Sequence, residues 1–200
     1  MKDTMRSILL AESRAVAAIP VSDDYARAVE LITEHVHRRH GKLVAAGMGK
    51  SGQIAMNIAK MFCSTGTPAT HLHPSDAQHG DLGVLAPDDV LLLVSNSGET
   101  REILELIDLV EKLHDSLPVI VITGAADSPL AHRADAVLLT GNPTEACTLN
   151  LAPTTSTTVM SVIGDVLVVN VMREIGFSRE DYARRHHGGS LGSAARSDIK

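Results

Sequence analysis

The sequence predicts an α/β fold: a three-layer αβα sandwich built around a parallel sheet of five strands. Short apolar runs alternate along the chain with longer segments of helical periodicity, a pattern typical of right-handed βαβ units. Polar, glycine-containing turns follow two of the apolar runs. The 200 residues, 44% of them hydrophobic, are enough for one domain with a substantial core. In such a sheet, ligands bind beyond the carboxyl ends of the strands.

The N-terminal part, residues 1–40, is predicted to form two helices that pack on the domain. Apolar residues at helical spacing mark the first helix, which Pro20 ends. Ser22 is then a suitable N-cap for the second. The domain itself is expected to span residues 41–192, followed by a short C-terminal tail, residues 193–200.

Five apolar runs of the domain are predicted to be strands because each is short and bounded by turn residues. They comprise residues 43–46, 69–72, 90–94, 117–123 and 136–139. Helices are predicted after the first and third strands and at residues 154–175, where a long apolar segment could pack on the sheet or against another subunit. The glycine-rich segment 184–192 is predicted to be a polar loop.

Composition argues against several classes of partner. The 18 basic and 24 acidic residues give a net charge of −6, and only 2% of the residues are aromatic, which disfavours binding to a phosphate backbone or to stacked bases. Cys63 and Cys147 show no CxxC spacing, and no signal peptide or long apolar segment stands at the N-terminus. We therefore expect a cytoplasmic protein without a nucleic-acid or membrane partner.

A polar loop follows the third strand and contains three hydroxyl side chains around a glycine: Ser95, Asn96, Ser97, Gly98, Glu99, Thr100. The next helix begins at Arg101, so the hydroxyls lie beside unpaired N–H groups at a helix N-terminus, where an anion is favoured. Ser97 or Thr100 could instead simply cap the helix. Capping needs only one hydroxyl, so the three together favour a phosphate site.

A second glycine turn, Gly47-Met48-Gly49-Lys50-Ser51-Gly52, follows the first strand and satisfies GxGxxG. A dinucleotide site such as one for NAD is the runner-up interpretation, because the acidic residue expected after the second strand is missing. A Walker A loop would need glycine where Val44 stands. The turn is best interpreted as one that brings Ser51 and backbone N–H groups to a phosphate, with Lys50 nearby.

Two carboxylates and two histidines stand out beside these loops, although for each of the ten histidines a surface or satisfied core position is the ordinary interpretation. Glu102 lies in the first turn of the helix after the serine loop, where favourable interaction with the dipole could also explain it. Glu145 has no such structural explanation in the sequence. His79 and His186 stand in polar segments that contain glycine. No HxxxH or HExxH spacing occurs, so no metal site is predicted.

Taken together, these motifs resemble the sugar isomerase (SIS) domain family, and within it the arabinose-5-phosphate isomerases of the lipopolysaccharide Kdo pathway. The matching segments are GMGKSG (47–52), HGDLG (79–83), SNSGETRE (95–102), EAC (145–147), LAPTTSTT (151–158) and HHGGSLG (186–192). The serine loop marks only the broad family, whereas HGDLG, EAC, LAPTTSTT and the tail segment HHGGSLG narrow the match to this isomerase group. The chain departs from the family pattern at Asp76, usually glutamate, at His187, usually proline, and at Gln53, which follows the GKSG turn.

The resemblance implies a dimer or tetramer with active sites at subunit contacts, interconverting D-arabinose 5-phosphate and D-ribulose 5-phosphate without a metal or other cofactor. Many members of this group continue into a pair of CBS domains, and the sequence ends at Lys200, close to where such a region would begin. We expect a single-domain form, with a natural one and a truncated one both left open. Carried over residue by residue, the catalytic candidates are Lys50, Glu102, Glu145 and His186. The candidates for substrate binding are Gly49, Ser51, His79, Ser95, Asn96, Ser97 and Thr100.

Aldose–ketose isomerisation is acid–base chemistry throughout. On this hypothesis Glu145 moves the carbon proton through an enediolate, while Lys50 stabilises the developing oxygen charge. His186, from this or a neighbouring subunit, opens the sugar ring, and Glu102 holds Lys50 or exchanges oxygen protons. Two alternatives stay open: a non-catalytic sugar-phosphate sensor, and an isomerase for a hexulose or heptose phosphate.

Overall fold

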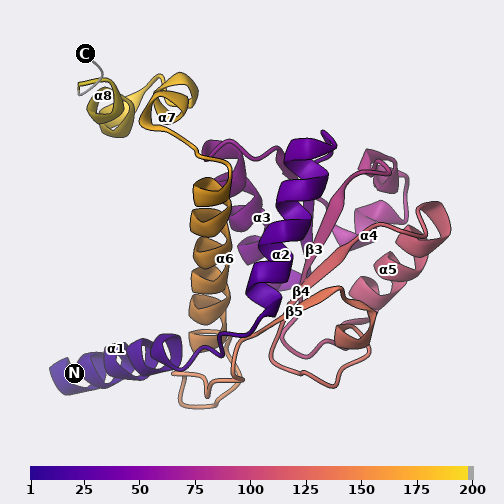
Figure 1. Ribbon diagram of the computed structural model, residues 1–200. Helices are drawn as coiled ribbons and strands as arrows, with labels where there is room; N and C mark the ends of the chain where they lie inside the picture. Colours follow the sequence, from indigo (N-terminus) through magenta and orange to yellow (C-terminus); the bar gives the residue numbers. More distant parts are fainter. Residues whose placement is uncertain (198–200) are drawn as a thin grey trace.

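The computed structural model describes residues 1–197 and contains one parallel sheet of five strands (Figure 1). The strands are β1 Leu43–Gly47, β2 Ala69–His71, β3 Val90–Val94, β4 Val119–Thr123 and β5 Ala136–Leu139. Their order in the sheet is β2-β1-β3-β4-β5, and every neighbouring pair is parallel. The predicted α/β class and strand number are confirmed, and each predicted strand agrees with an observed one to within two residues.

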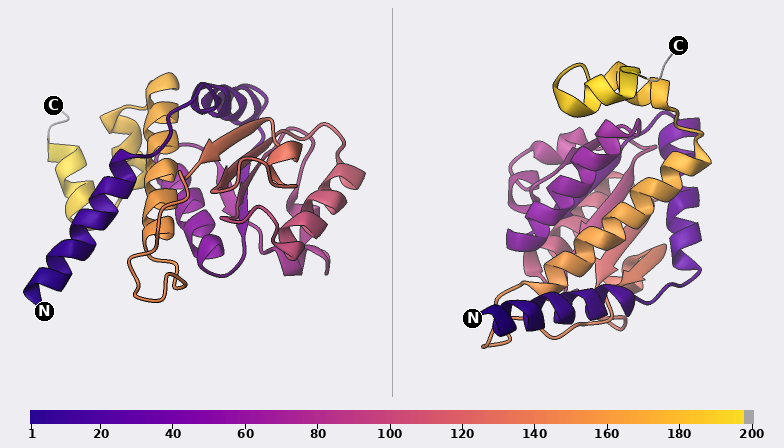
Figure 2. Two further views of the ribbon diagram at one scale, coloured as in Figure 1. Left: turned by 90° about the horizontal axis from the view of Figure 1, so that it is seen from below. Right: turned by 90° about the vertical axis from the view of Figure 1, so that its left-hand side faces the viewer.

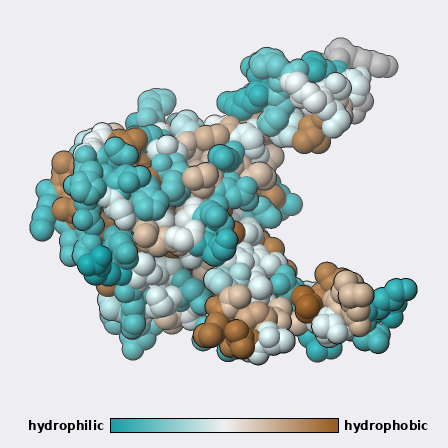
Figure 3. All heavy atoms as spheres, turned by 180° about the vertical axis from the view of Figure 1, so that it is seen from behind, coloured by the Kyte–Doolittle hydropathy of each residue, from teal (hydrophilic) through white to brown (hydrophobic). Residues whose placement is uncertain are grey.

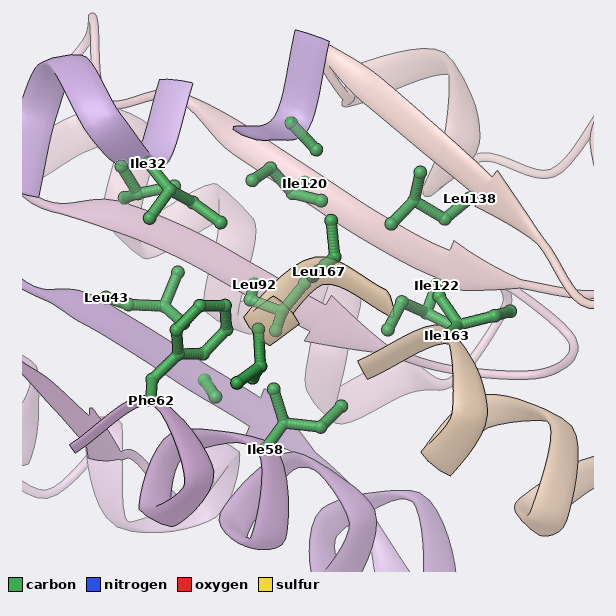
Figure 4. Close-up of a cluster of buried hydrophobic side chains, with 14 of the residues drawn as sticks. Ile32, Leu43, Ile58, Phe62, Leu92, Ile120, Ile122, Leu138, Ile163 and Leu167 are labelled. Carbon is green, nitrogen blue, oxygen red and sulfur yellow. The ribbon is translucent and has the colours of Figure 1, made fainter. Parts of the chain in front are cut away.

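Two hydrophobic cores lie on the two faces of this sheet because successive strand residues point to opposite sides. In β1, Leu43 and Ala45 belong to one core, and Val44 and Ala46 belong to the other. Figure 4 shows the first core, in which Phe62 packs beside the central strands. All five residues of β3 are fully buried, which explains why this strand is a continuous apolar run.

Helices cover both faces. The first core is closed by α2 Asp24–Ile32, α3 Gly49–Ser64 and α6 Thr155–Glu174, and the second by α4 Pro74–Ala77 and α5 Arg101–Leu113. A π-helical turn, η1 Thr33–Arg38, extends α2, and the 3₁₀ turns are η2 Asp81–Val84 and η3 Ala131–Arg133. The result is the predicted three-layer arrangement (Figure 2).

Two helical arms project from this body (Figures 1 and 3). The first arm is α1, Lys2–Ala17, which has no buried residue, and the second is formed by α7 Arg179–Arg185 and α8 Gly189–Ser197. The prediction of a polar loop at 184–192 is wrong for most of the segment. Its first two residues end α7, which a capping box of Ser178 and Asp181 starts, and α8 begins at Gly189, so only residues 186–188 lie outside a helix. Asp23, not Ser22, occupies the N-cap position of α2.

The long apolar helix α6 serves as a core helix of the fold. By length and composition alone it could cross a membrane, with a mean hydropathy of 1.5, but half of that segment is buried inside the protein. Gly164 lets it approach α3 closely, since a Cβ there would lie 2.5 Å from Ile58 Cγ1. Packing against α3 and the sheet therefore accounts for its apolar composition.

Candidate active site

The turn after β1 brings the backbone of α3 close to the strand. A Cβ on Gly47 would lie 2.8 Å from the Ser51 carbonyl, and one on Gly52 would lie 2.6 Å from the Gly47 carbonyl oxygen. Gly49 has a φ of 55°, a left-handed conformation that favours glycine. The three glycines are thus required by close approach and by backbone conformation, and they leave Lys50 and Ser51 in the first turn of α3.

The loop after β3 is folded back on itself. Ser95, which is buried, lies 2.9 Å from Thr100 through the two hydroxyl oxygens, and the Glu99 N–H donates to Ser97 Oγ over 3.2 Å. Gly98 has a φ of 64°, and a Cβ at this position would overlap Ser128 Oγ. Only glycine therefore allows the loop to pass so close to the loop after β4.

Neither α3 nor α5 receives a side-chain cap within the part of the chain that the structure describes. Thr100 occupies the N-cap position of α5, but its hydroxyl is engaged with Ser95. The capping interpretation of Thr100 is therefore wrong. Both helix N-termini present N–H groups where an anion is favoured, and they follow β1 and β3, between which the strand order reverses. Ligands of open α/β sheets bind at this position.

Glu145 lies in the connection between β5 and α6, and its carboxylate is held at the start of that helix. Oε2 accepts hydrogen bonds from Thr154 N at 2.7 Å, Thr154 Oγ1 at 2.9 Å and Ser156 N at 3.3 Å. Oε1 accepts a short one from Ser156 Oγ. The Glu145 N–H in turn donates to Asn150 Oδ1 over 2.8 Å. Glu145 thus has a structural partner that the sequence did not indicate.

These contacts decide the charge of Glu145. Burial is the largest single influence and by itself would raise the pKa of this carboxyl. The hydrogen bonds from Ser156 and Thr154 act in the opposite direction, and together they hold the pKa below its ordinary value. Glu145 is therefore an anion at neutral pH, able in principle to accept a proton.

The sequence pattern of the SIS domain matches residues 35–170. The chain belongs to the SIS domain family. Arabinose 5-phosphate isomerase KdsD of Yersinia pestis is 44% identical over 189 residues, which cover 94% of this chain and 56% of that protein. The chain thus spans about half the length of the curated relatives it matches.

Two solved structures share this SIS domain over nearly their whole length. One is a candidate phosphosugar isomerase involved in capsule formation from Bacteroides fragilis, with 59% identity, a TM-score of 0.93, and coverage of 94% of this chain and 98% of that one. The other is an Escherichia coli CFT073 protein in complex with arabinose 5-phosphate, with 36% identity, a TM-score of 0.84, and coverage of 91% and 95%.

The SIS domain does not bring all four catalytic candidates together. His186 follows α7, where its ring stacks on Tyr182 with a centroid distance of 3.8 Å. Arg185 and Phe177 contact the region of Gly66, just beyond the C-terminus of α3, whereas Lys50 is at its N-terminus. The 20 residues of α6, about 30 Å in length, separate His186 from the Glu145 region. Within one chain, His186 lies at the far end.

The remaining candidates are found at the same edge of the sheet. Glu102 lies half-buried in the first turn of α5, and within residues 1–197 it forms no ion pair with Lys50, which is exposed. His79 is exposed beyond α4, a helix that Gln78 links to α5 through Glu105. No group of three His, Cys, Asp or Glu side chains that could hold a metal ion occurs in the described chain.

Asn96, a candidate for substrate binding, also forms structural hydrogen bonds. Its carbonyl oxygen accepts hydrogen bonds from Gly124 N at 2.9 Å and Thr123 Oγ1 at 3.2 Å, and its side-chain oxygen lies 3.5 Å from Thr140 Oγ1. The residue thereby joins the ends of β3, β4 and β5. Its assignment to substrate binding stays a prediction.

A cavity near Glu145 is lined partly by α1. This cavity, of about 510 Å³, lies between the C-terminal half of α1 and the segment after β5, and it includes Arg14 and Thr144. The larger cavity, of about 600 Å³, lies between α2 and α6 and does not include the strand ends. The strand ends are the candidate site, because the uncapped helices α3 and α5 and the carboxylates Glu102 and Glu145 are there.

Sequence reasoning missed the residues that hold Glu145. Ser156, Thr154 and Asn150 were not identified as its partners, although the hydroxyl-rich segment 151–158 was noted as a family motif. The available signal was a row of hydroxyls at the start of a long helix, shortly after a carboxylate. Such a row is typical of a helix N-terminus that binds an anion.

Proposed function

We propose that this SIS domain is an aldose–ketose isomerase that interconverts D-arabinose 5-phosphate and D-ribulose 5-phosphate through an enediolate. The observation that carries the proposal is the pair of uncapped helix N-termini, α3 and α5, which meet at the reversal point of the sheet with Ser51, Ser95 and Thr100 beside them. A phosphate group fits this arrangement. The similarity to KdsD proteins and to a structure with bound arabinose 5-phosphate supports this substrate.

The phosphate would fix one end of the sugar and leave C1 and C2 to the acid–base residues. Binding energy at the phosphate orients the reacting carbons. Glu145, an anion held at the start of α6, would take the proton between C1 and C2. Lys50 would stabilise the oxygen charge that develops, and Glu102 would exchange oxygen protons or hold Lys50 once substrate is bound.

Ring opening is assigned to His186 of a neighbouring copy. The position of His186 at the far end of α6 supports a contribution to another subunit's site. The exposed apolar side chains of α1 (Met5, Ile8, Leu9, Leu10), together with the exposed Val169 of α6, support association of copies. We therefore propose a homo-oligomer, a dimer or tetramer, with active sites at subunit contacts.

The product would feed Kdo and lipopolysaccharide biosynthesis, as the similarity to KdsD suggests. A cytoplasmic location is proposed with it. Both cysteines, Cys63 and Cys147, are free, which is consistent with a reducing compartment.

Purified protein incubated with D-arabinose 5-phosphate in deuterated water is expected to produce ribulose 5-phosphate with deuterium on the carbon that exchanges its proton. Proton transfer through a carboxylate gives partial exchange with solvent, which mass spectrometry measures. A panel containing hexulose and heptose phosphates serves as the specificity control. If only another sugar phosphate of the panel is turned over, the assignment of D-arabinose 5-phosphate as the substrate is wrong. Binding without any turnover would support a sensor.

Co-expression of Lys50→Ala with His186→Asn is expected to restore activity that each variant lacks alone. If His186 acts on a neighbouring copy, a dimer with one copy of each variant keeps one of its two composite sites intact. Random pairing then leaves about a quarter of all sites intact, and dimers selected by both tags keep about half of theirs. Specific activity of separately tagged, co-purified oligomers measures this. If the co-purified oligomers stay inactive, the assignment of His186 to a neighbouring site is wrong.

A further inference from the structure

The two carboxylate oxygens of Glu145 have different surroundings. Oε2 accepts three hydrogen bonds, from both Thr154 donors and from the Ser156 N–H, all at the start of α6. Oε1 accepts one, from Ser156 Oγ. An oxygen with three donors has little capacity left to accept a proton. Oε1 is therefore the oxygen that remains available for chemistry, and Ser156 is the side chain that holds it.

The other contacts of this region keep the arrangement fixed. Asn150 Oδ1 accepts from the Glu145 N–H over 2.8 Å, and Cys147 Sγ accepts from the backbone N–H groups of Leu151 and Ala152 at 3.2 and 3.1 Å. Ser156 itself is buried, with 3% of its surface exposed. The Ser156 hydroxyl therefore has a defined orientation toward Oε1.

We propose that Ser156 is a positioning residue for the isomerisation, whose hydroxyl holds Glu145 Oε1 in place and sets the pH range in which that oxygen accepts the substrate's carbon proton. This inference rests on the proposed function. The hydrogen bond stabilises the charged form of the carboxyl, so its loss makes Glu145 take up a proton at higher pH. When the solution is acidified, activity that needs the carboxylate must then be lost at a higher pH in the variant than in the wild type.

Other titratable groups adjoin Glu145 on its own segment and on α1. They are Cys147, two residues along, Glu12, which accepts a hydrogen bond from Thr158 Oγ1 over 2.7 Å, and Arg14 at the cavity beside Thr144. None of them is hydrogen-bonded to the Glu145 carboxylate in the described part of the chain. Ser156→Ala leaves all three unchanged, so a shift in that variant reports on the hydroxyl.

The experiment measures the titration of the Glu145 carboxyl by NMR and, separately, the pH dependence of kcat/KM. In protein labelled with ¹³C at glutamate carboxyls, the Glu145 signal is assigned by its absence in Glu145→Gln and followed against pH. In Ser156→Ala we expect its titration midpoint, and the acid limb of kcat/KM, to move together to higher pH by roughly half a pH unit or more. Ser156→Thr, which keeps a hydroxyl, should restore both.

Ser161→Ala is the matched control, because Ser161 lies on the same helix and donates to the Thr157 carbonyl over 2.9 Å. Ser161→Ala should change neither the titration midpoint of Glu145 nor the acid limb of kcat/KM. The inference is overturned if the Glu145 midpoint does not rise in Ser156→Ala, or if it rises while the acid limb stays in place. Failure of the proposed function is distinguishable, because wild-type protein would then show no turnover before any variant is made, and the inference would fall with it.

Discussion

Replacing Glu145 by glutamine is expected to lower turnover of D-arabinose 5-phosphate by about 100-fold or more, the usual contribution of a positioned general base. Glutamine has nearly the same shape but cannot take up the carbon proton. Its amide oxygen can still accept hydrogen bonds from Thr154 at the start of α6, where the carboxylate now accepts them. Sugar-phosphate binding should change little, because the uncapped helices α3 and α5 are untouched. Turnover is measured by ketose formation and binding by calorimetry.

The matched control is Glu174→Gln, at the exposed C-terminal end of the same helix. It should retain wild-type turnover. Thermal unfolding of both variants separates a chemical defect from a folding defect, because Glu145→Gln replaces the acceptor beside Ser156 Oγ with an amide N–H₂ and so changes the hydrogen bonding at the helix start. If Glu145→Gln kept more than about a tenth of the activity, another residue would have to be the base.

The strands and the polar loops at their ends could be predicted from the sequence because both depend on neighbouring residues in the chain. Val90–Val94 is apolar throughout because β3 is buried on both faces, and the polar loop after it lies at a strand end. The sequence places Gly49 and Gly98 in polar turns, and in the structure both have the left-handed backbone that favours glycine. Strand order was not predicted, yet the two loops had to lie at one edge once all strands were parallel.

What failed depended on contacts between distant segments. Two helices occupy most of the segment predicted as a glycine-rich loop: a capping box of Ser178 and Asp181 starts α7, and α8 begins at Gly189. The length of α6 then places His186 far from the Glu145 region. Glu145 binds residues up to eleven positions away, across a turn that has no simple period. Neither relation follows from the spacing of apolar residues, which reports only which face of an element is buried.

Asp89→Ala is expected to lower the free energy of unfolding by about 3 kcal/mol, a large part of the usual total of about 5–15 kcal/mol. Asp89 is fully buried at the edge of the sheet opposite the candidate site. Its oxygens accept from Lys42 N at 2.8 Å, Lys42 Nζ at 2.6 Å and Ala86 N at 2.8 Å. Alanine leaves the ammonium and two backbone N–H groups without this acceptor. Urea unfolding at pH 7 measures the loss.

Asp88→Ala is the control, since Asp88 is the exposed neighbour and its substitution should change stability by no more than about 0.5 kcal/mol. Adding Lys42→Met to Asp89→Ala separates the two parts of the loss. The double variant should regain whatever stability the unpaired ammonium costs, while the Lys42 and Ala86 N–H groups still lack their acceptor. Because Lys42 keeps 28% of its side chain exposed, its ammonium can reach water, and we expect the backbone groups to account for the larger share. A loss below about 1 kcal/mol in Asp89→Ala would mean that water replaces the carboxylate at this edge.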